Sequence, residues 1–430
     1  MPTDALPYLT SDLPGIGGVI RQRPHDFFVQ EIPLYEPGGA GEHLFCGIEK
    51  VGLTTFDAVH RIADALHISS RDVGYAGMKD ANAVTRQVIS IPRVDEHIVR
   101  NLNISGLTIL WAARHGNKLR LGHLAGNRFA IRIRHVEPTG VVKVRPILDV
   151  LHRRGMPNYF GEQRFGRRGN NDAVGAALVR GDHMGMLRLL LGSPDPQIDD
   201  AQSLGARAAF DRHDNETAMR LFPRHCGMER RILARLMKTH RPTAAVRAID
   251  QKLRRLWISA LQSRLFNNLL ARRIDRIDRL IDGDLAMKHE NGACFHVENA
   301  AVEQARCDAF EISPTGPLVG YRMTLPRGLA LAIEEQVFSD AGLSPQSLRQ
   351  SRERAKGERR ALRVRPADAE LSGGVDEHGP HVTVAFTLPR GAYATVLLRE
   401  LMKNDSPGAA GTPGNDEGSH AENHEDQAEN

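Results

Sequence analysis

The chain has 430 residues, which is too long for one compact core and indicates two domains with additions. Its 41% hydrophobic and 25% charged content is that of an ordinary globular protein. No apolar run approaches the roughly 18 residues that span a membrane, so we expect no membrane contact. The N-terminus lacks a basic segment followed by an apolar one, and we therefore expect a cytoplasmic protein.

The net charge of +5 is unevenly distributed along the chain. Residues 405–430 contain seven acidic residues and no Lys or Arg, so residues 1–404 carry +12. A basic body suits a phosphate-rich partner such as nucleic acid, although a basic surface can also merely aid solubility. The acidic tail lacks large apolar side chains, and we predict that it is disordered.

Cysteine spacing excludes two further classes of protein. The four cysteines contain no CxxC pair, which argues against both a disulfide framework and a zinc knuckle. We therefore expect reduced thiols and no metal. The residues are Cys46, Cys226, Cys294 and Cys307.

Residues 13–150 are typical of a mainly β region with one or two helices. Apolar residues recur at helical spacing over 56–66, which predicts an amphipathic helix. Within 128–136, alternation predicts one buried face and an opposite face that presents Arg128, Arg132 and Arg134. The predicted strands are 19–20, 27–32, 43–48, 84–91, 118–121 and 128–136.

Residues 170–250 change to Ala- and Leu-rich sequence and predict helices separated by Gly and Pro breaks. A long helix is predicted over 252–281, with a buried leucine stripe. Its arginines are typical of a solvated helix surface, and phosphate contact is the alternative. Strands are predicted at 359–364 and 381–388, and a helix at 393–401.

The most informative stretch is GYAGMKD at residues 74–80, followed by AVTRQ at 83–87. It places Asp80 beside Lys79, after a glycine-punctuated turn and before a strand-like run. A carboxylate held in this way is a candidate nucleophile or general base, and a nearby lysine favours its ionised form. Taken alone, an adjacent Lys-Asp pair is more often a solvated turn.

Four more segments carry aromatic residues or asparagine where a plain core would have aliphatic residues. They are RPHDFFVQE at 23–31, GNRF at 126–129, PNYFGEQRFG at 157–166 and FTLPRGAYAT at 386–395. Together with the Asp80 stretch, from about residue 13 to 401, they resemble the TruD family of tRNA pseudouridine synthases. PNYFGEQRFG and AGMKD are specific strings, whereas GNRF alone is not.

The resemblance implies an α+β fold in two parts. The first is the pseudouridine synthase catalytic domain, with a mixed, mainly antiparallel sheet, built from residues 1–154 and 357–404. The second is a large inserted α/β TRUD domain at 155–356. This chain departs from compact family members in a longer stretch around 170–250 and in its acidic tail.

The resemblance also implies an isomerase that converts uridine to pseudouridine at position 13 in the D arm of tRNA. No group is gained or lost in this reaction, so no cofactor is expected. The target base must be flipped out of its stack to be reached. Asp80 corresponds to the catalytic aspartate of the family, and whether it attacks the sugar or the base stays open.

Substrate-binding residues are implied in the same way. Phe129 matches the residue that stacks on the base, while Phe27 and Phe386 match other aromatic positions near the active site. Asn127 suits a uracil edge or the loop that carries Asp80. Each ring alone is also typical of core packing.

Three further residues are implied with less defined roles. Lys79 is expected to tune Asp80 or to hold a phosphate or ribose oxygen. Asn158 is expected at the hinge into the inserted domain, and Arg164 to touch the RNA backbone, with a structural role equally open. We expect a monomer whose partner is tRNA.

Three alternatives stay open from the sequence. The protein can be an RNA-binding or tRNA-folding protein in which catalysis is secondary. It can act on another tRNA site or on an mRNA. It can also be a metal-dependent nuclease that uses Asp282 and Asp284, although no third ligand supports that hypothesis.

Overall fold

The computed structural model describes residues 6–344, 346–347 and 355–404. These residues form two compact units, one holding 6–158 and 364–404 and the other Tyr159–Arg363. The tail predicted to be disordered, 405–430, lies outside the described residues. Within the described part of the chain, no helix combines the length and apolarity needed to cross a bilayer.

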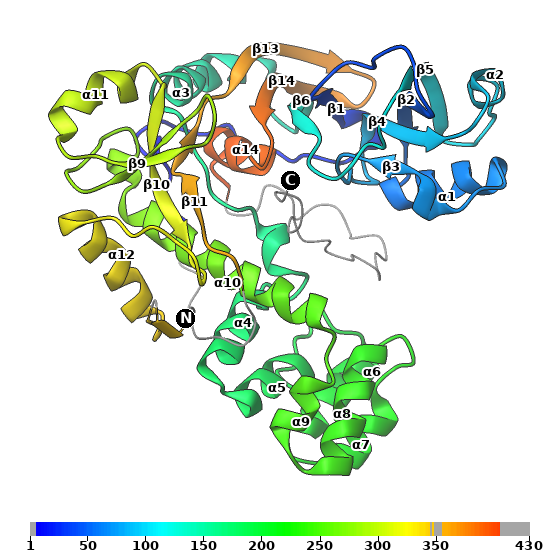
Figure 1. Cartoon of the computed structure of the whole chain (residues 1–430), viewed down its shortest axis with the longest axis vertical. Helices are drawn as coiled ribbons and strands as arrows, with labels where there is room; N and C mark the ends of the chain where they lie inside the picture. The colour runs from blue at the N-terminus through cyan, green and yellow to red at the C-terminus, as the bar shows by residue number, and fades with distance from the viewer. Residues whose placement is uncertain (1–5, 345, 348–354, 405–430) are drawn as a thin grey trace. The chain divides into compact units, whose positions relative to one another are not determined.

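An eight-stranded sheet forms the centre of the first unit (Figure 1). Its order is β13-β14-β6-β1-β4-β2-β5, with the short β3 paired to β4. β1 and β4 run parallel, and the other neighbouring pairs run antiparallel. The sheet is therefore mixed and mainly antiparallel, which confirms the predicted α+β fold class. Its strands are β1 (Phe27–Pro33), β2 (His43–Val51), β3 (Gly74–Tyr75), β4 (Val84–Pro92), β5 (Leu107–His115), β6 (Leu124–Arg134), β13 (Ala367–Asp376) and β14 (Gly379–Pro389).

Four α-helices and three 3₁₀ turns accompany this sheet in the described residues. They are α1 (Thr55–Ala65), α2 (Glu96–Arg100), α3 (Val141–Arg154), α14 (Ala394–Met402), η1 (Pro24–Asp26), η2 (Ser70–Asp72) and η3 (Pro138–Gly140). Two short strands, β7 (Met156–Pro157) and β12 (Arg363–Val364), pair with each other. The prediction of helices at 56–66 and 393–401 is confirmed by α1 and α14.

Helix α1 has a strong local start signal. The Thr54 hydroxyl accepts a hydrogen bond from the Asp57 backbone N–H, and the Asp57 carboxylate accepts one from the Thr54 N–H. Val59 and Ile62 on its buried stripe pack in the same core as residues of β2, β4 and β5. This packing fixes the first turn of α1, which contacts the loop that carries Asp80.

Strand β6 departs from prediction at its last residue. Arg128 is exposed, as alternation predicts, but Arg134 on the same face is buried. Asp26 and Asp376 accept hydrogen bonds from the Arg134 guanidinium at 2.5 and 2.6 Å. The prediction that this face presents Arg134 to solvent is wrong, because two carboxylates from η1 and β13 compensate its burial.

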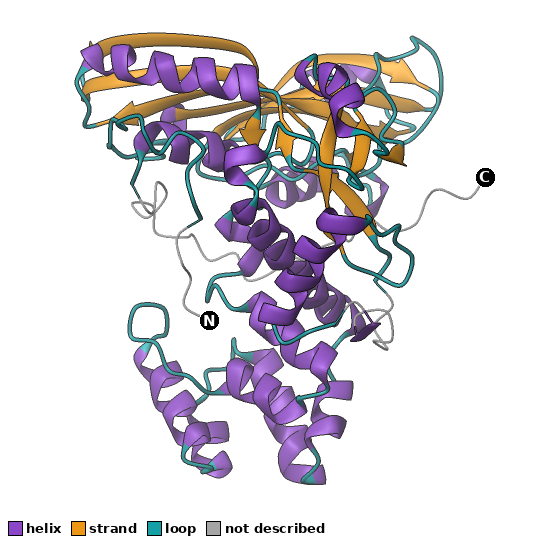
Figure 2. Ribbon diagram, turned by 90° about the vertical axis from the view of Figure 1, so that its left-hand side faces the viewer, coloured by secondary structure: helices purple, strands orange, loops and turns teal. Residues whose placement is uncertain are grey.

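The second unit joins a helical region to a small sheet. Figure 2 shows the region of α5–α9 as helices connected by loops. Its apolar core includes residues of α4–α9 and Trp257 of α10. The sheet has the order β11-β10-β8-β9, and α10 contacts β10. The α-helices are α4 (Asn171–Arg180), α5 (His183–Leu191), α6 (Ala201–Asp211), α7 (Asn215–Leu221), α8 (Gly227–Thr239), α9 (Pro242–Arg247), α10 (Gln251–Arg272), α11 (Ala300–Asp308) and α12 (Gly328–Asp340). The strands and 3₁₀ turns are β8 (Leu285–Lys288), β9 (Cys294–His296), β10 (Ile312–Leu318), β11 (Glu358–Ala361), η4 (Glu162–Phe165) and η5 (Ile274–Arg276).

Three other sequence-based boundaries are wrong. The long helix ends at Arg272 rather than at 281, because Arg273 instead forms a buried ion pair with Asp284 and η5 follows. Residues 118–121 form no strand, and 19–20 contributes only an isolated bridge between Val19 and Arg134. The predicted strands at 359–364 and 381–388 are present as β11 with β12 and as β14.

Candidate active site

Asp80 lies in the loop of residues 76–83 between β3 and β4, which we call the Asp80 loop. Its carboxylate is 43% exposed and accepts a hydrogen bond from the Arg21 guanidinium at 2.8 Å. The loop is held against α1, since the Lys79 N–H donates to the Thr55 hydroxyl at 2.8 Å. Asp80 is therefore an accessible carboxylate on an anchored loop.

Arg21 is a site residue that the sequence did not indicate. Besides binding Asp80, its guanidinium lies 4.4 Å from the centre of the Phe27 ring. Its φ of 60° is in the left-handed region, which is unfavourable for a residue with a side chain. Such strain clusters at functional sites. Its Nε is buried and donates no hydrogen bond to the described residues.

Lys79 points away from Asp80, to the buried Glu31. Its ammonium donates to the Glu31 carboxylate at 3.2 Å, and its side chain is only 7% exposed. The cation beside Asp80 is thus Arg21, in place of the expected Lys79, because the Lys79 ammonium is bound to Glu31. Burial raises the pKa of Glu31, while Lys79 and the Val88 N–H act in the opposite direction.

The structure brings the three expected phenylalanines together. Phe129 of β6 stacks on Phe386 of β14, with ring centres 5.3 Å apart and planes at 26°. Phe27 of β1 meets Phe129 edge-on at 6.5 Å. The three strands are neighbours, and register places Phe129 opposite both Phe386 and Val29. Arg21 therefore links Asp80 to this aromatic cluster.

Burial distinguishes the three rings. Phe386 is 0%, Phe27 2% and Phe129 8% exposed, so Phe129 retains the most accessible surface. Asn127 lies two residues before Phe129, on the same side of β6. Its Oδ1 is buried and accepts no hydrogen bond from the described residues. A buried amide oxygen without a partner is costly, and a ligand donor would satisfy it.

The two expected residues of the PNYFGEQRFG segment lie outside this cluster. Asn158 is buried at 5% exposure and is the last residue of the first segment of the first unit. Arg164 belongs to the second unit, where its guanidinium donates to the Ser259 and Ser263 hydroxyls of α10. These contacts give Arg164 a structural role in the free protein.

The nuclease hypothesis depends on Asp282 and Asp284, and both carboxylates bind neighbouring protein groups. Asp284 is buried and accepts hydrogen bonds from the Arg273 guanidinium at 2.6 and 3.0 Å. Asp282 accepts from the Ala300 N–H at the start of α11. No group of three or more His, Cys, Asp or Glu in the described ranges could hold a metal ion.

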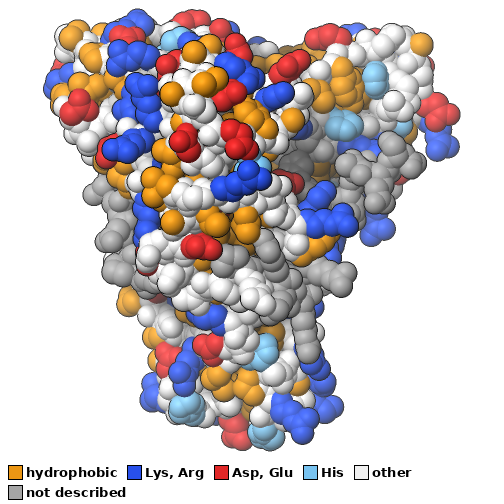
Figure 3. Space-filling view, turned by 60° about the vertical axis from the view of Figure 1, so that its left-hand side comes forward, with side chains coloured by type: hydrophobic (Ala, Val, Ile, Leu, Met, Phe, Trp, Pro, Cys, Tyr) orange, Lys and Arg blue, Asp and Glu red, His pale blue; other side chains and the backbone are white. Residues whose placement is uncertain are grey.

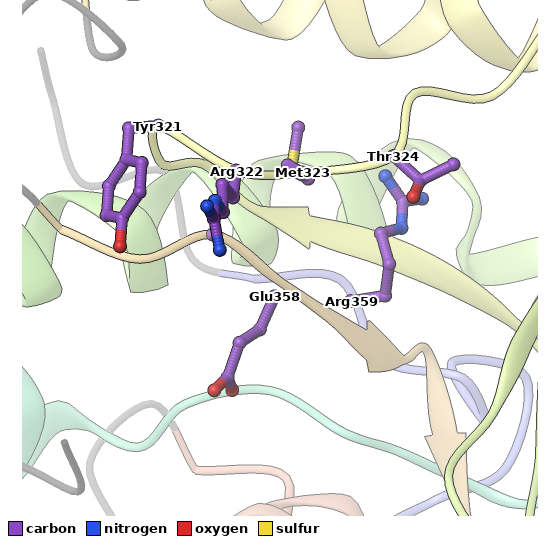
Figure 4. A pocket seen from close by; sticks show the side chains of 7 residues that line it. Tyr321, Arg322, Met323, Thr324, Glu358 and Arg359 are labelled. Carbon is purple, nitrogen blue, oxygen red and sulfur yellow. The ribbon is translucent and has the colours of Figure 1, made fainter. Parts of the chain in front are cut away.

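A pocket in the second unit does not offer an alternative set of catalytic residues. It measures about 560 Å³ and is lined by 321–324 and 357–359. Figure 4 shows Arg359 turned toward Thr324, with Glu358 on the opposite side of the strand. The Arg359 guanidinium also donates to the buried Glu334 carboxylate at 2.6 Å, so it is committed to a structural ion pair.

Comparison with known proteins identifies the family of the chain. Residues 5–401 match the family model for tRNA pseudouridine synthase D (TruD). The chain is 48% identical over 406 residues to tRNA pseudouridine synthase D of Geobacter sulfurreducens, covering 94% of this chain and 98% of the relative. It is 38% identical over 403 residues to that of Anaeromyxobacter dehalogenans, covering 93% and 97%. A crystal structure from Methanosarcina mazei that carries the TruD name superposes with a TM-score of 0.82 at 28% identity, covering 93% of this chain and 96% of the other. The chain therefore belongs to the tRNA pseudouridine synthase D family, whose known reaction is the isomerisation of uridine to pseudouridine.

Proposed function

We propose that this protein isomerises the uridine at position 13 in the D arm of tRNA, with Asp80 as its catalytic carboxylate. The observation that carries the proposal is the accessible Asp80 carboxylate, bound at 2.8 Å by Arg21, which in turn covers the Phe27 ring of the aromatic cluster. In the proposal the first unit holds the catalytic domain, and the second unit is the family's insertion.

The reaction balances without a co-reactant. The bond between uracil N1 and the sugar C1′ breaks, a bond between C5 and C1′ forms, the C5 proton leaves and N1 gains a proton. Asp80 attacks the nucleoside as a carboxylate, and its accessibility suits this role. Arg21 orients the carboxylate through its hydrogen bond at 2.8 Å.

The neighbouring residues fit a flipped uracil. Phe129, the most exposed of the three rings, offers a face for stacking, and Phe386 supports it from behind. Asn127 Oδ1 lacks a partner among the described residues and is suited to accept the uracil N3–H. Binding would therefore satisfy a buried polar atom, which discriminates uracil from a base without that donor.

Charge supports RNA as the partner. Arg231, Arg235 and Lys238 lie along one exposed face of α8, and none forms an ion pair with the described residues. Figure 3 shows Lys and Arg side chains on α7–α9, at the bottom of the view. Like charges at this helical spacing repel one another, and phosphate groups would relieve that repulsion. We propose that this face contacts the tRNA backbone.

The test of the function is the Asp80→Asn variant, which keeps the size of the side chain and removes its negative charge. Expected are an unchanged tRNA Kd and no release of tritium from uridine labelled at C5. A control, Asp64→Asn on the exposed face of α1, should keep wild-type turnover.

A tRNA with cytidine at position 13 should gain no pseudouridine. Turnover by Asp80→Asn would remove Asp80 from its role, and modification elsewhere would reassign the target.

A further inference from the structure

Lys50, near the end of β2, binds the backbone of the Asp80 loop. Its ammonium donates to the carbonyl oxygens of Leu53 at 2.5 Å, Asp80 at 3.0 Å and Lys79 at 3.2 Å. The residue is 0% exposed. An ammonium has three donor hydrogens, so the three carbonyls match its full donor capacity.

Two of these carbonyls belong to the residues that place the Asp80 carboxylate. Thr55 of α1 forms a second tie, since its hydroxyl accepts from the Lys79 N–H and donates to Gln87 Oε1 of β4 at 2.9 Å. The Asp80 loop is thus held from β2, α1 and β4. Among the contacts that fix the Asp80 backbone, only the one from Lys50 is carried by a titratable side chain in the described residues.

We infer that Lys50 is a positioning residue, which holds the Asp80 loop so that the carboxylate faces the substrate. This inference rests on the proposed role of Asp80. A displacement of about 1 Å at a reacting group can cost about 100-fold in rate, so a clamp on the backbone of Asp80 bears directly on turnover.

The cost of burying Lys50 supports a functional reason for it. Burial lowers the pKa of Lys50 to about 8, while Asp80 and Asp57 act to raise it and Lys79 acts to lower it further. No carboxylate in the described residues pairs directly with its ammonium, whose three partners are carbonyls. A buried cation without a direct counter-charge is destabilising, and such groups cluster at functional sites.

Titration of Lys50 separates a positioning role from a purely structural one. The neutral amine has two donor hydrogens, so one of the three carbonyls loses its donor as pH rises through about 8. Turnover should then fall. The unfolded chain binds this proton more tightly than the folded one between pH 8 and 10.5, so Lys50 makes the fold more stable as pH rises through this window. As pH rises through about 8, turnover should therefore fall while the contribution of Lys50 to the free energy of unfolding rises.

The experiment measures single-turnover pseudouridine formation on tRNA for wild type, Lys50→Met, Asp80→Asn and the control Lys143→Met. Lys143 is exposed on α3 and lies outside the site. Lys50→Met should bind tRNA with unchanged Kd, react about 100-fold more slowly and lack the alkaline loss of rate near pH 8 that we expect of wild type. Its free energy of unfolding should no longer rise between pH 8 and 10.5 through this group.

Several outcomes would overturn the inference. One is a Lys50→Met rate within about threefold of wild type, which is below the effect of a misplaced catalytic group. Another is an alkaline loss that persists in that variant. If Lys50→Met does not fold, the pH dependence of the wild-type rate tests the inference. A wild-type rate that stays constant as pH rises through 8 would show that Lys50 has no positioning role. Activity of Asp80→Asn would instead overturn the proposed function, whereas an inactive Asp80→Asn beside a fully active Lys50→Met would overturn the role of Lys50 alone.

Discussion

Arg21 shows what a single side chain contributes to the candidate site, because it binds the Asp80 carboxylate and covers the Phe27 ring. Replacing it by Met keeps much of the apolar contact and removes the charge. A charge-assisted hydrogen bond is worth about 1.5–3 kcal/mol, so Arg21→Met should lower kcat by about 10- to 100-fold. The exposed Arg23, changed to Met, is the matched control. Equal kcat values for the two variants would assign Arg21 to packing only.

The same residue marks the limit of reading the site from sequence. Asp80 and Phe129 lie in motifs that carry the family resemblance, so they could be chosen as candidates. Arg21 and Lys50 reach the loop from elements far away in the chain, and no pattern around them indicates that contact. Lys79 carried a signal, yet its partner Glu31 is set by the pairing of β1 and β4. Partners of charged side chains depend on tertiary structure, which a single sequence does not reveal.

Strand β6 allows a test at the level of an element, because its ion pairs include a buried one and a strongly exposed one. Asp26 and Arg134 have side chains 1% and 2% exposed, whereas Arg128 and Glu370 are 45% and 69% exposed. Removing one partner of a buried pair costs about 3–5 kcal/mol, and an exposed pair contributes about 0–1 kcal/mol. Asp26→Ala should therefore lower the free energy of unfolding far more than Glu370→Ala. Denaturant titrations with similar losses for both would show that Arg134 is not compensated by Asp26.

Elements with strong local signals were predicted, and elements that depend on partners were missed. Helix α1 has a capping box and an apolar stripe, and both are visible in sequence. Strand β13 alternates only weakly, since its residues are mostly exposed or half-buried, and pairing with β14 defines it. Strand β5 is likewise defined by its pairing with β2. In the eight-stranded sheet, the two edge strands β13 and β5 therefore escaped prediction, while β1, β2, β4, β6 and β14 did not.

At the scale of the whole molecule, the positive charge predicts binding that weakens with salt. Each phosphate contact contributes about 0.7–0.9 to the slope of log K against log salt concentration. If Arg231, Arg235 and Lys238 each contact one phosphate, changing all three to Gln should reduce that slope by about 2–3 and raise the Kd for tRNA. The single-turnover rate at saturating tRNA should stay unchanged, because α8 belongs to the second unit and Asp80 to the first.

A matched control separates local contact from net charge. Arg272, Arg306 and Arg327 are exposed or half-buried cations of the same unit, and each is paired with a carboxylate. Changing these three to Gln alters the net charge by the same amount as the α8 variant, so a purely long-range effect would weaken binding equally in both. If tRNA contacts α8, only the α8 variant should show a smaller slope of log K against log salt concentration. Equal salt slopes for the two variants would show that tRNA is drawn by the overall field and does not touch this helix.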